Sequence, residues 1–215
     1  QIGHFKVFLA ALSELAPTLA GKTKHLPHGL LRLTEGKMGS RQGNVITAAS
    51  LIEDMTKKAL AKNEDPLIAE QVAIGAIKYM ILRQAPGGDI IFDPEKSLSL
   101  EGDSGPYLQY ALVRARSVLS KSDGAKDMTP PNTPYTLERL VLRFPEVVAN
   151  AYSEKAPQQV TSYLTLLASE WNSFYAQERI IGDEYEGYKL LLAEAFATTM
   201  ENGLRLLGIP TPERM

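Results

Sequence analysis

Cysteine is absent from the chain, and histidine occurs only three times. Without thiols there is no disulfide framework and no thiol chemistry, and a zinc site would lack its usual ligands. We therefore expect no bound metal. No apolar run is long enough to span a bilayer, so we expect no membrane contact and a cytoplasmic location.

A strong net charge is also missing, because the 215 residues carry a formal charge of only −2. The chain as a whole is not a basic nucleic-acid binder, and any contact with RNA would have to use local patches. The length allows one large domain or two small ones with an ample core.

Strand signals are few, whereas apolar residues at helical spacing are common. A helix is expected over residues 4–16, ending at Pro17, with an apolar face made of Phe5, Phe8, Leu9, Leu12 and Leu15. Further helices are expected over residues 67–84, 136–144, 157–178 and 184–207. The sequence thus predicts a mainly α protein, a helical bundle preceded by a small mixed segment.

Within the mixed segment, Leu30, Leu31 and Leu33 predict a short buried strand, and residues 90–92 a second extended piece. Asp93 and Pro94 should open a brief helix. Thr47 should cap another helix, whose inward residues are expected to be Leu51, Ile52, Met55 and Leu60.

Residues 100–120 organise the rest of the chain. Gly102 and Gly105 are interpreted as a flexible turn, after which Ser104 caps a helix and Pro106 occupies its first turn. One stripe of this helix is apolar and comprises Leu108, Ala111, Leu112, Ala115, Val118 and Leu119. A second stripe comprises Tyr107, Tyr110, Arg114, Ser117 and Lys121.

The second stripe has two interpretations. Two tyrosines and two cations on one helix face suit a surface that stacks bases and contacts phosphate. Alternatively, the tyrosines belong to the core and the cations are solvated. The ladder Val160, Leu164, Leu167, Trp171 and Phe174 indicates core only, with Tyr175 beside it and able to face outward.

The glycine-rich stretch 35–44 is expected to be a loop. Its glycines, together with Lys37 and Arg41, allow backbone amides and cations to converge on an anion. A solvated loop would have a similar composition.

Several stretches match one family. Residues 37–43 (KMGSRQG) resemble the second signature loop of class I aminoacyl-tRNA synthetases in the form used by arginyl-tRNA synthetases. Residues 74–79, 90–93 and 101–117 (EGDSGPYLQYALVRARS) are similar to the same enzymes' path into a helical anticodon-binding domain, and residues 207–215 (LGIPTPERM) to their C-terminus.

The resemblance implies that residues 1–65 are the end of a catalytic nucleotide-binding domain and residues 66–215 an anticodon-binding domain. The family joins arginine to tRNA(Arg) in two steps, using ATP with Mg²⁺ as a substrate and no tightly bound cofactor. Lys37 and Ser40 would be catalytic, stabilising phosphoryl charge. ATP would contact Lys37, Met38, Gly39, Ser40 and His4, and arginine would contact Gln1.

For tRNA, the resemblance implies that Tyr107, Tyr110 and Arg114 surround the anticodon loop and that Tyr175 and Met215 approach a splayed base.

Gln42 departs from the family pattern, because many relatives have lysine there. The His-x-Gly-His signature is absent, since residues 25–28 (HLPH) lack its glycine. We therefore expect a part of a longer monomeric ligase that is inactive alone. The alternatives are a stand-alone tRNA-binding module without ligase activity and a helical scaffold with no RNA partner.

Overall fold

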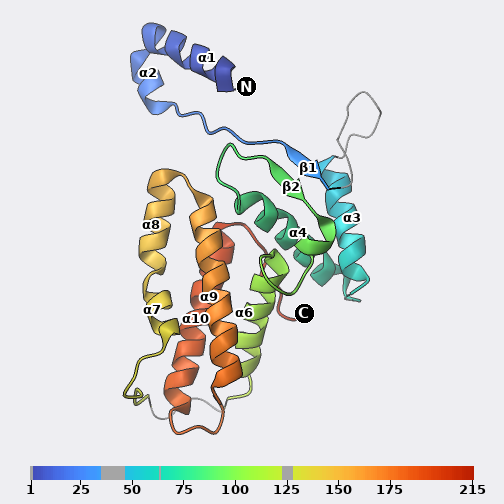
Figure 1. Ribbon diagram of the computed structural model, residues 1–215, viewed down its shortest axis with the longest axis vertical. Coiled ribbons are helices and arrows are strands. Elements are labelled where there is room, and N and C mark those ends of the chain that lie inside the picture. The colour runs from blue at the N-terminus through green and yellow to red at the C-terminus, as the bar shows by residue number, and fades with distance from the viewer. Residues whose placement is uncertain (1, 35–46, 63, 123–127) are drawn as a thin grey trace.

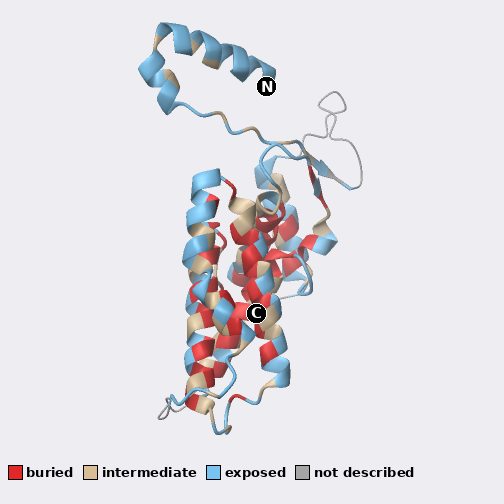
Figure 2. Ribbon diagram, turned by 60° about the vertical axis from the view of Figure 1, so that its left-hand side comes forward, coloured by how far each residue is buried: buried red, intermediate tan, exposed pale blue. Residues whose placement is uncertain are grey.

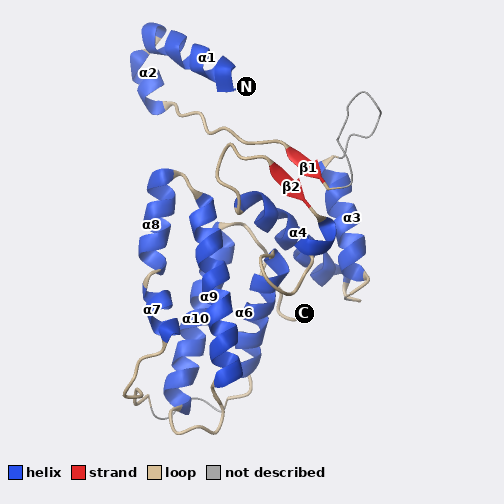
Figure 3. Cartoon of the chain, viewed as in Figure 1, coloured by secondary structure: helices blue, strands red, loops and turns tan. Residues whose placement is uncertain are grey.

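The computed structural model describes residues 2–34, 47–62, 64–122 and 128–215 (Figure 1). Two helices come first: α1 (Ile2–Leu15) and α2 (Pro17–Lys22). The mixed segment then contains β1 (Leu31–Leu33), α3 (Ala48–Leu60), α4 (Pro66–Leu82), β2 (Ile90–Phe92) and α5 (Pro94–Ser97). The bundle follows with α6 (Gly105–Leu119), α7 (Thr136–Leu142), α8 (Phe144–Glu154), α9 (Pro157–Gln177) and α10 (Glu186–Leu206). The prediction of a mainly helical fold is confirmed (Figure 3).

The predicted helix starts follow local capping chemistry. The Thr47 hydroxyl accepts from the amide of Ser50, and the Ser104 hydroxyl accepts from the amide of Tyr107. Asp93 accepts from two amides at the start of α5, with Pro94 in the first turn. Each cap satisfies amides that a helix start leaves without intrahelical partners, so these three predictions are confirmed.

The core is continuous from α3 through α4 into the bundle. Figure 2 shows the buried residues gathered where the bundle helices and α4 face one another. The ladder Val160, Leu164, Leu167, Trp171 and Phe174 on α9 is buried throughout, as predicted. Within the described ranges no helix is long and apolar enough to cross a membrane.

Helices α4 and α6 approach one another closely at two glycines. A Cβ added to Gly105 would lie 2.2 Å from the carbonyl oxygen of Gly75. One turn further along α6, the buried amide of Gln109 donates to the carbonyls of Gln71 and Pro210. The close contact therefore joins α4, α6 and the C-terminal tail and fixes the direction in which α6 presents its other face.

Three predictions about the mixed segment are wrong in detail. The strand at Leu31–Leu33 pairs with β2 in a parallel two-stranded sheet, but Leu30 precedes it and is 64% exposed. A sheet of two strands covers too little surface to bury a leucine that lies just before it. On α3, Met55 is buried, whereas Ile52 and Leu60 are exposed because α3 packs on α4 along one narrow stripe.

The first helix was correctly predicted, but its apolar face has no buried residue. Phe5, Phe8 and Leu15 are exposed, and Phe5 stacks on His25 at 4.0 Å between ring centroids. Pro17 does not simply end the helix, because it occupies the first turn of α2. The amphipathic pattern correctly predicts a helix, but in the described part of the chain its apolar side is covered only in part, as where His25 stacks on Phe5.

Candidate nucleic-acid interface

The orientation of α6 follows from its apolar stripe. Leu108, Ala111, Leu112 and Ala115 have no exposed surface, so this side of the helix faces the core. Tyr107, Tyr110 and Arg114 lie at steps of three and four on a different stripe and are half-buried. The burial of one stripe thus places the other at the rim of the core, where aromatic rings keep a solvent-facing side.

Three of the predicted residues come into contact; we call them the Tyr–Arg cluster. The guanidinium carbon of Arg114 lies 4.2 Å from the ring centroid of Tyr175 on α9 and 5.6 Å from that of Tyr110. Asn172 on α9 accepts from the same guanidinium at 3.3 Å. The cation is therefore held between two rings, one from each helix, by cation–π attraction and a hydrogen bond.

A rigid aromatic base supports this cluster. Trp171 is fully buried, lies 6.1 Å from Tyr175 and stacks on Phe196 of α10 at 4.6 Å. Tyr175, by contrast, keeps 38% of its surface exposed. Sequence reasoning assigned Trp171 to the core but missed Asn172, whose spacing of three residues before Tyr175 was the available signal.

Tyr107 and Met215 occupy other places. Tyr107 lies in the first turn of α6 and is half-buried against the core. Met215 is half-buried, and its neighbour Arg214 pairs with Asp65 at the start of α4 at 2.9 Å. No hydrogen bond or ring contact in the described part of the chain joins Tyr107 or Met215 to the Tyr–Arg cluster.

The other predicted site residues are mostly not described. Gln1, Lys37, Met38, Gly39 and Ser40 lie outside the described residues. His4 is exposed on α1, in edge contact with the ring of Phe5. The assignment of these residues to ATP and arginine therefore stays a prediction.

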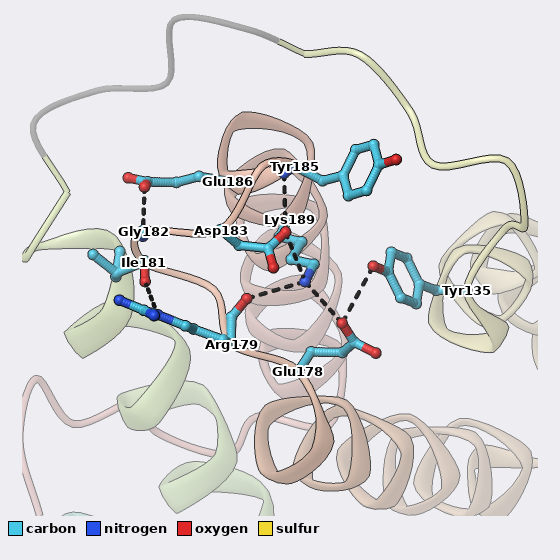
Figure 4. Close-up of polar contacts among 9 residues, drawn as sticks. All are labelled: Tyr135, Glu178, Arg179, Ile181, Gly182, Asp183, Tyr185, Glu186 and Lys189. Carbon is cyan, nitrogen blue, oxygen red and sulfur yellow. Dashed lines mark hydrogen bonds and ion pairs between the residues drawn. The ribbon is translucent and has the colours of Figure 1, made fainter.

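A buried ion-pair network secures the end of α9 that carries Tyr175 (Figure 4). Lys189 on α10 is 2% exposed, and its Nζ donates to Glu178 at 2.8 Å, to Asp183 at 3.0 Å and to the Arg179 carbonyl at 3.0 Å. Tyr135 also donates to Glu178, at 3.4 Å. These bonds tie the α9–α10 connection to the body of the bundle directly after Gln177, and sequence reasoning did not anticipate them.

The charges of this network are mutually stabilised. Burial by itself lowers the pKa of Lys189, but its hydrogen bonds to Glu178 and Asp183 outweigh burial and raise that pKa above 10.5. The pKa of Asp183 is lowered by the amide of Tyr185 and by Lys189. Lys189 and Asp183 are thus both charged at neutral pH.

Comparison with known proteins identifies a family and several relatives of this chain. Residues 108–215 match the family described as DALR anticodon binding domain. The chain is 32% identical to an arginine–tRNA ligase of Flavobacterium psychrophilum over 99% of its own length and 38% of that protein's. Its structure is similar to the arginyl-tRNA synthetase of Thermus thermophilus, with a TM-score of 0.80 and 34% identity over 96% of this chain and 38% of that one.

The match to this family over residues 108–215, which form most of the helical bundle and the tail, identifies an anticodon-binding domain. The chain belongs to the DALR anticodon binding domain family, among its arginyl-tRNA synthetase members. It spans about two fifths of the length of the curated relatives that it matches. The resemblance noted from the sequence motifs is therefore confirmed.

Proposed function

We propose that this chain is the part of an arginine–tRNA ligase that binds the anticodon loop of tRNA(Arg). The observation that carries the proposal is the Tyr–Arg cluster, in which Arg114 lies between the rings of Tyr110 and Tyr175 on the rim of the bundle. Unpaired bases in RNA loops are recognised mainly by stacking on aromatic rings and guanidinium planes. The cluster offers both, fixed by Asn172 and by the buried Trp171.

The role of Tyr110 is tested by its replacement with alanine. We expect Tyr110→Ala to weaken binding of tRNA(Arg) by about 1–3 kcal/mol, the usual worth of one base–aromatic stack. Fluorescence titration of labelled tRNA at fixed salt measures the affinity. Tyr152→Ala is the matched control, because Tyr152 is 84% exposed on α8 and is not one of the predicted anticodon residues. Equal affinity of the two variants would contradict the proposal.

Arg114 provides a second measure in the same titration. If its guanidinium contacts phosphate, Arg114→Ala should also reduce the salt slope of binding by about one unit. An unchanged slope with weaker binding would assign Arg114 to stacking instead.

The catalytic contribution rests mainly on residues outside the described ranges, with His4 as the described exception. Lys37 and Ser40, with the backbone of Met38 and Gly39, would close over the triphosphate of Mg²⁺-bound ATP while pyrophosphate leaves. Gln1 would contact the substrate arginine, and His4 would lie near the adenosine of ATP. In this proposal the loop acts only in a complete ligase, with arginine, ATP and tRNA(Arg) as its substrates.

We expect the chain on its own not to activate arginine, because its sequence contains no His-x-Gly-His signature. Arginine-dependent exchange between ATP and pyrophosphate measures this step directly. The expected rate equals that of a control without protein. Exchange clearly above that control would show that the chain holds a complete activation site.

A further inference from the structure

A polar groove lies between α4 and α9, beside the start of α6. Its volume is about 440 Å³, and most of its lining residues carry hydroxyl groups: Tyr79, Thr161, Ser162, Thr165 and Ser169. Leu166, Arg83 and Asp103 complete the lining, and Arg83 pairs with Asp103 at 3.4 Å. Tyr79 and Asp103 lie in stretches that resemble the family, but none of the predicted site residues lines this groove.

The inner hydroxyls are held in fixed positions. The Tyr79 hydroxyl and the Thr165 hydroxyl lie 2.8 Å apart, and Thr165 donates to the carbonyl of Thr161. Tyr79 is almost fully buried, and burial raises the pKa of its phenol, so it stays neutral. Ser162 and Ser169, in contrast, are exposed on α9 and face solvent. The groove therefore combines a rigid inner side with hydroxyls open to a ligand.

The charges in the groove favour a neutral ligand. Arg83 and Asp103 balance one another. The carboxyl end of α4 is also part of the site, since Thr161 contacts the carbonyl of Leu82, and a helix C-terminus disfavours anions. A phosphate group thus gains little here, whereas a sugar hydroxyl can donate to a carboxylate or accept from a guanidinium and from serines.

The groove and the Tyr–Arg cluster share one face of α9. Thr165, Ser169 and Asn172 follow one another at steps of four and three, and Asn172 binds Arg114. Seven residues of α-helix place Thr165 about 10 Å from Asn172 along the axis. An RNA strand whose bases stack on the cluster therefore has its neighbouring sugars within reach of the groove.

We propose that this groove binds ribose hydroxyls of the RNA strand whose anticodon bases stack on the Tyr–Arg cluster, with Ser162 and Ser169 as the contacting residues. The inference rests on the proposed function and adds a sugar-recognising subsite to it. Since the 2′-hydroxyl is the group that separates RNA from DNA, the groove makes binding selective for ribose.

The test combines a protein variant with a chemical change in the RNA. The chain is titrated with the anticodon stem–loop of tRNA(Arg), either all-ribose or 2′-deoxy at the stem nucleotides that flank the loop. We expect deoxy substitution to weaken wild-type binding about threefold to tenfold, the worth of roughly one neutral hydrogen bond. Ser162→Ala/Ser169→Ala should weaken binding of the all-ribose RNA to a similar extent and bind both RNAs equally.

The double variant should stay folded, because both serines are exposed and alanine is the better helix former. Ser153→Ala, an exposed serine on α8, is the matched control and should keep the wild-type response. Deoxy substitution without effect on the wild type, or with equal effect on the double variant, overturns the proposal.

The same titration separates the subsite from the proposed function. Tyr110→Ala should bind both RNAs more weakly but keep their ratio, since it leaves the groove intact. If Tyr110→Ala binds both RNAs as tightly as the wild type, anticodon stacking on this residue is contradicted. If the double variant at the same time no longer distinguishes the all-ribose from the deoxy RNA, the sugar subsite is retained. Failure of the wild-type chain to bind either RNA overturns both.

Discussion

Replacing Gly105 with alanine is expected to lower the free energy of unfolding by about 3 kcal/mol, the upper end for an overpacked core. The added Cβ would lie 2.2 Å from the carbonyl oxygen and 2.4 Å from the carbonyl carbon of Gly75. Both are backbone atoms of α4, which cannot rotate away as a side chain does. Relief requires α4 and α6 to separate, which would loosen the apolar contacts on both sides of the glycine pair.

Urea unfolding followed by circular dichroism measures this loss. Gly21→Ala is the matched control, because a Cβ there has nothing within 4 Å and alanine favours the helix. We expect the control to unfold at or above the wild-type denaturant concentration. If Gly105→Ala unfolds together with the control, α4 and α6 do not need their close approach.

The role of Gly105 in helix packing could not be predicted from the sequence. Gly102 and Gly105 were both assigned to a turn, and Gly102 has the positive φ of 71° that such a turn needs. Gly105, however, is the first residue of α6, and its lack of a side chain serves the contact with Gly75. In the sequence, a glycine needed for a turn cannot be told from a glycine needed for close helix packing. Only the packing of α4 against α6 distinguishes the two roles.

Burial was predictable where other helices cover the apolar stripe of a helix. The stripes of α6 and α9 are buried as expected because several helices meet there. The apolar face of α1 has equally clear periodicity, yet Phe8 is 47% exposed. Periodicity states which residues share a face, but not whether another element covers that face.

The candidate site was partly predictable for the same reason. The spacing of Tyr110 and Arg114 on one helix fixes their proximity, whereas Tyr175 entered through the family resemblance. Asn172, which orients Arg114, and Lys189, which secures the end of α9, were missed. The sequence pattern predicts that a lysine in an amphipathic helix is solvated. Lys189 is buried instead because the connection between α9 and α10 folds back over it.

Removing the charge of Lys189 is the second change for which we expect a large effect. Lys189→Met should cost about 3 kcal/mol of unfolding free energy, because breaking a buried ion pair leaves the partners uncompensated. The cost stays at the lower end of that class, since Glu178 and Asp183 keep 34% and 25% of their side chains exposed and can be partly hydrated. Because Gln177 ends α9 directly before this network, binding of tRNA through Tyr175 should weaken as well.

The pH dependence of the wild type follows from the same network. The pKa of Lys189 in the folded chain lies above 10.5, its ordinary value in an unfolded chain. The contribution of Lys189 is therefore fully present below pH 10.5 and is lost as the pH rises through the elevated pKa. Lys189→Met should lack this alkaline loss when unfolding is measured across that range.

A triple variant separates the charge imbalance from simple loss of packing. Lys189→Met combined with Glu178→Gln and Asp183→Asn removes all three charges together, and the amides can still accept the hydrogen bonds from Tyr135 and from the amide of Tyr185. Since replacing a whole buried ion network is far cheaper than breaking it, the triple variant should regain most of the lost stability. A triple variant as unstable as Lys189→Met alone would instead assign the loss to the packing of the lysine stem beneath the α9–α10 connection.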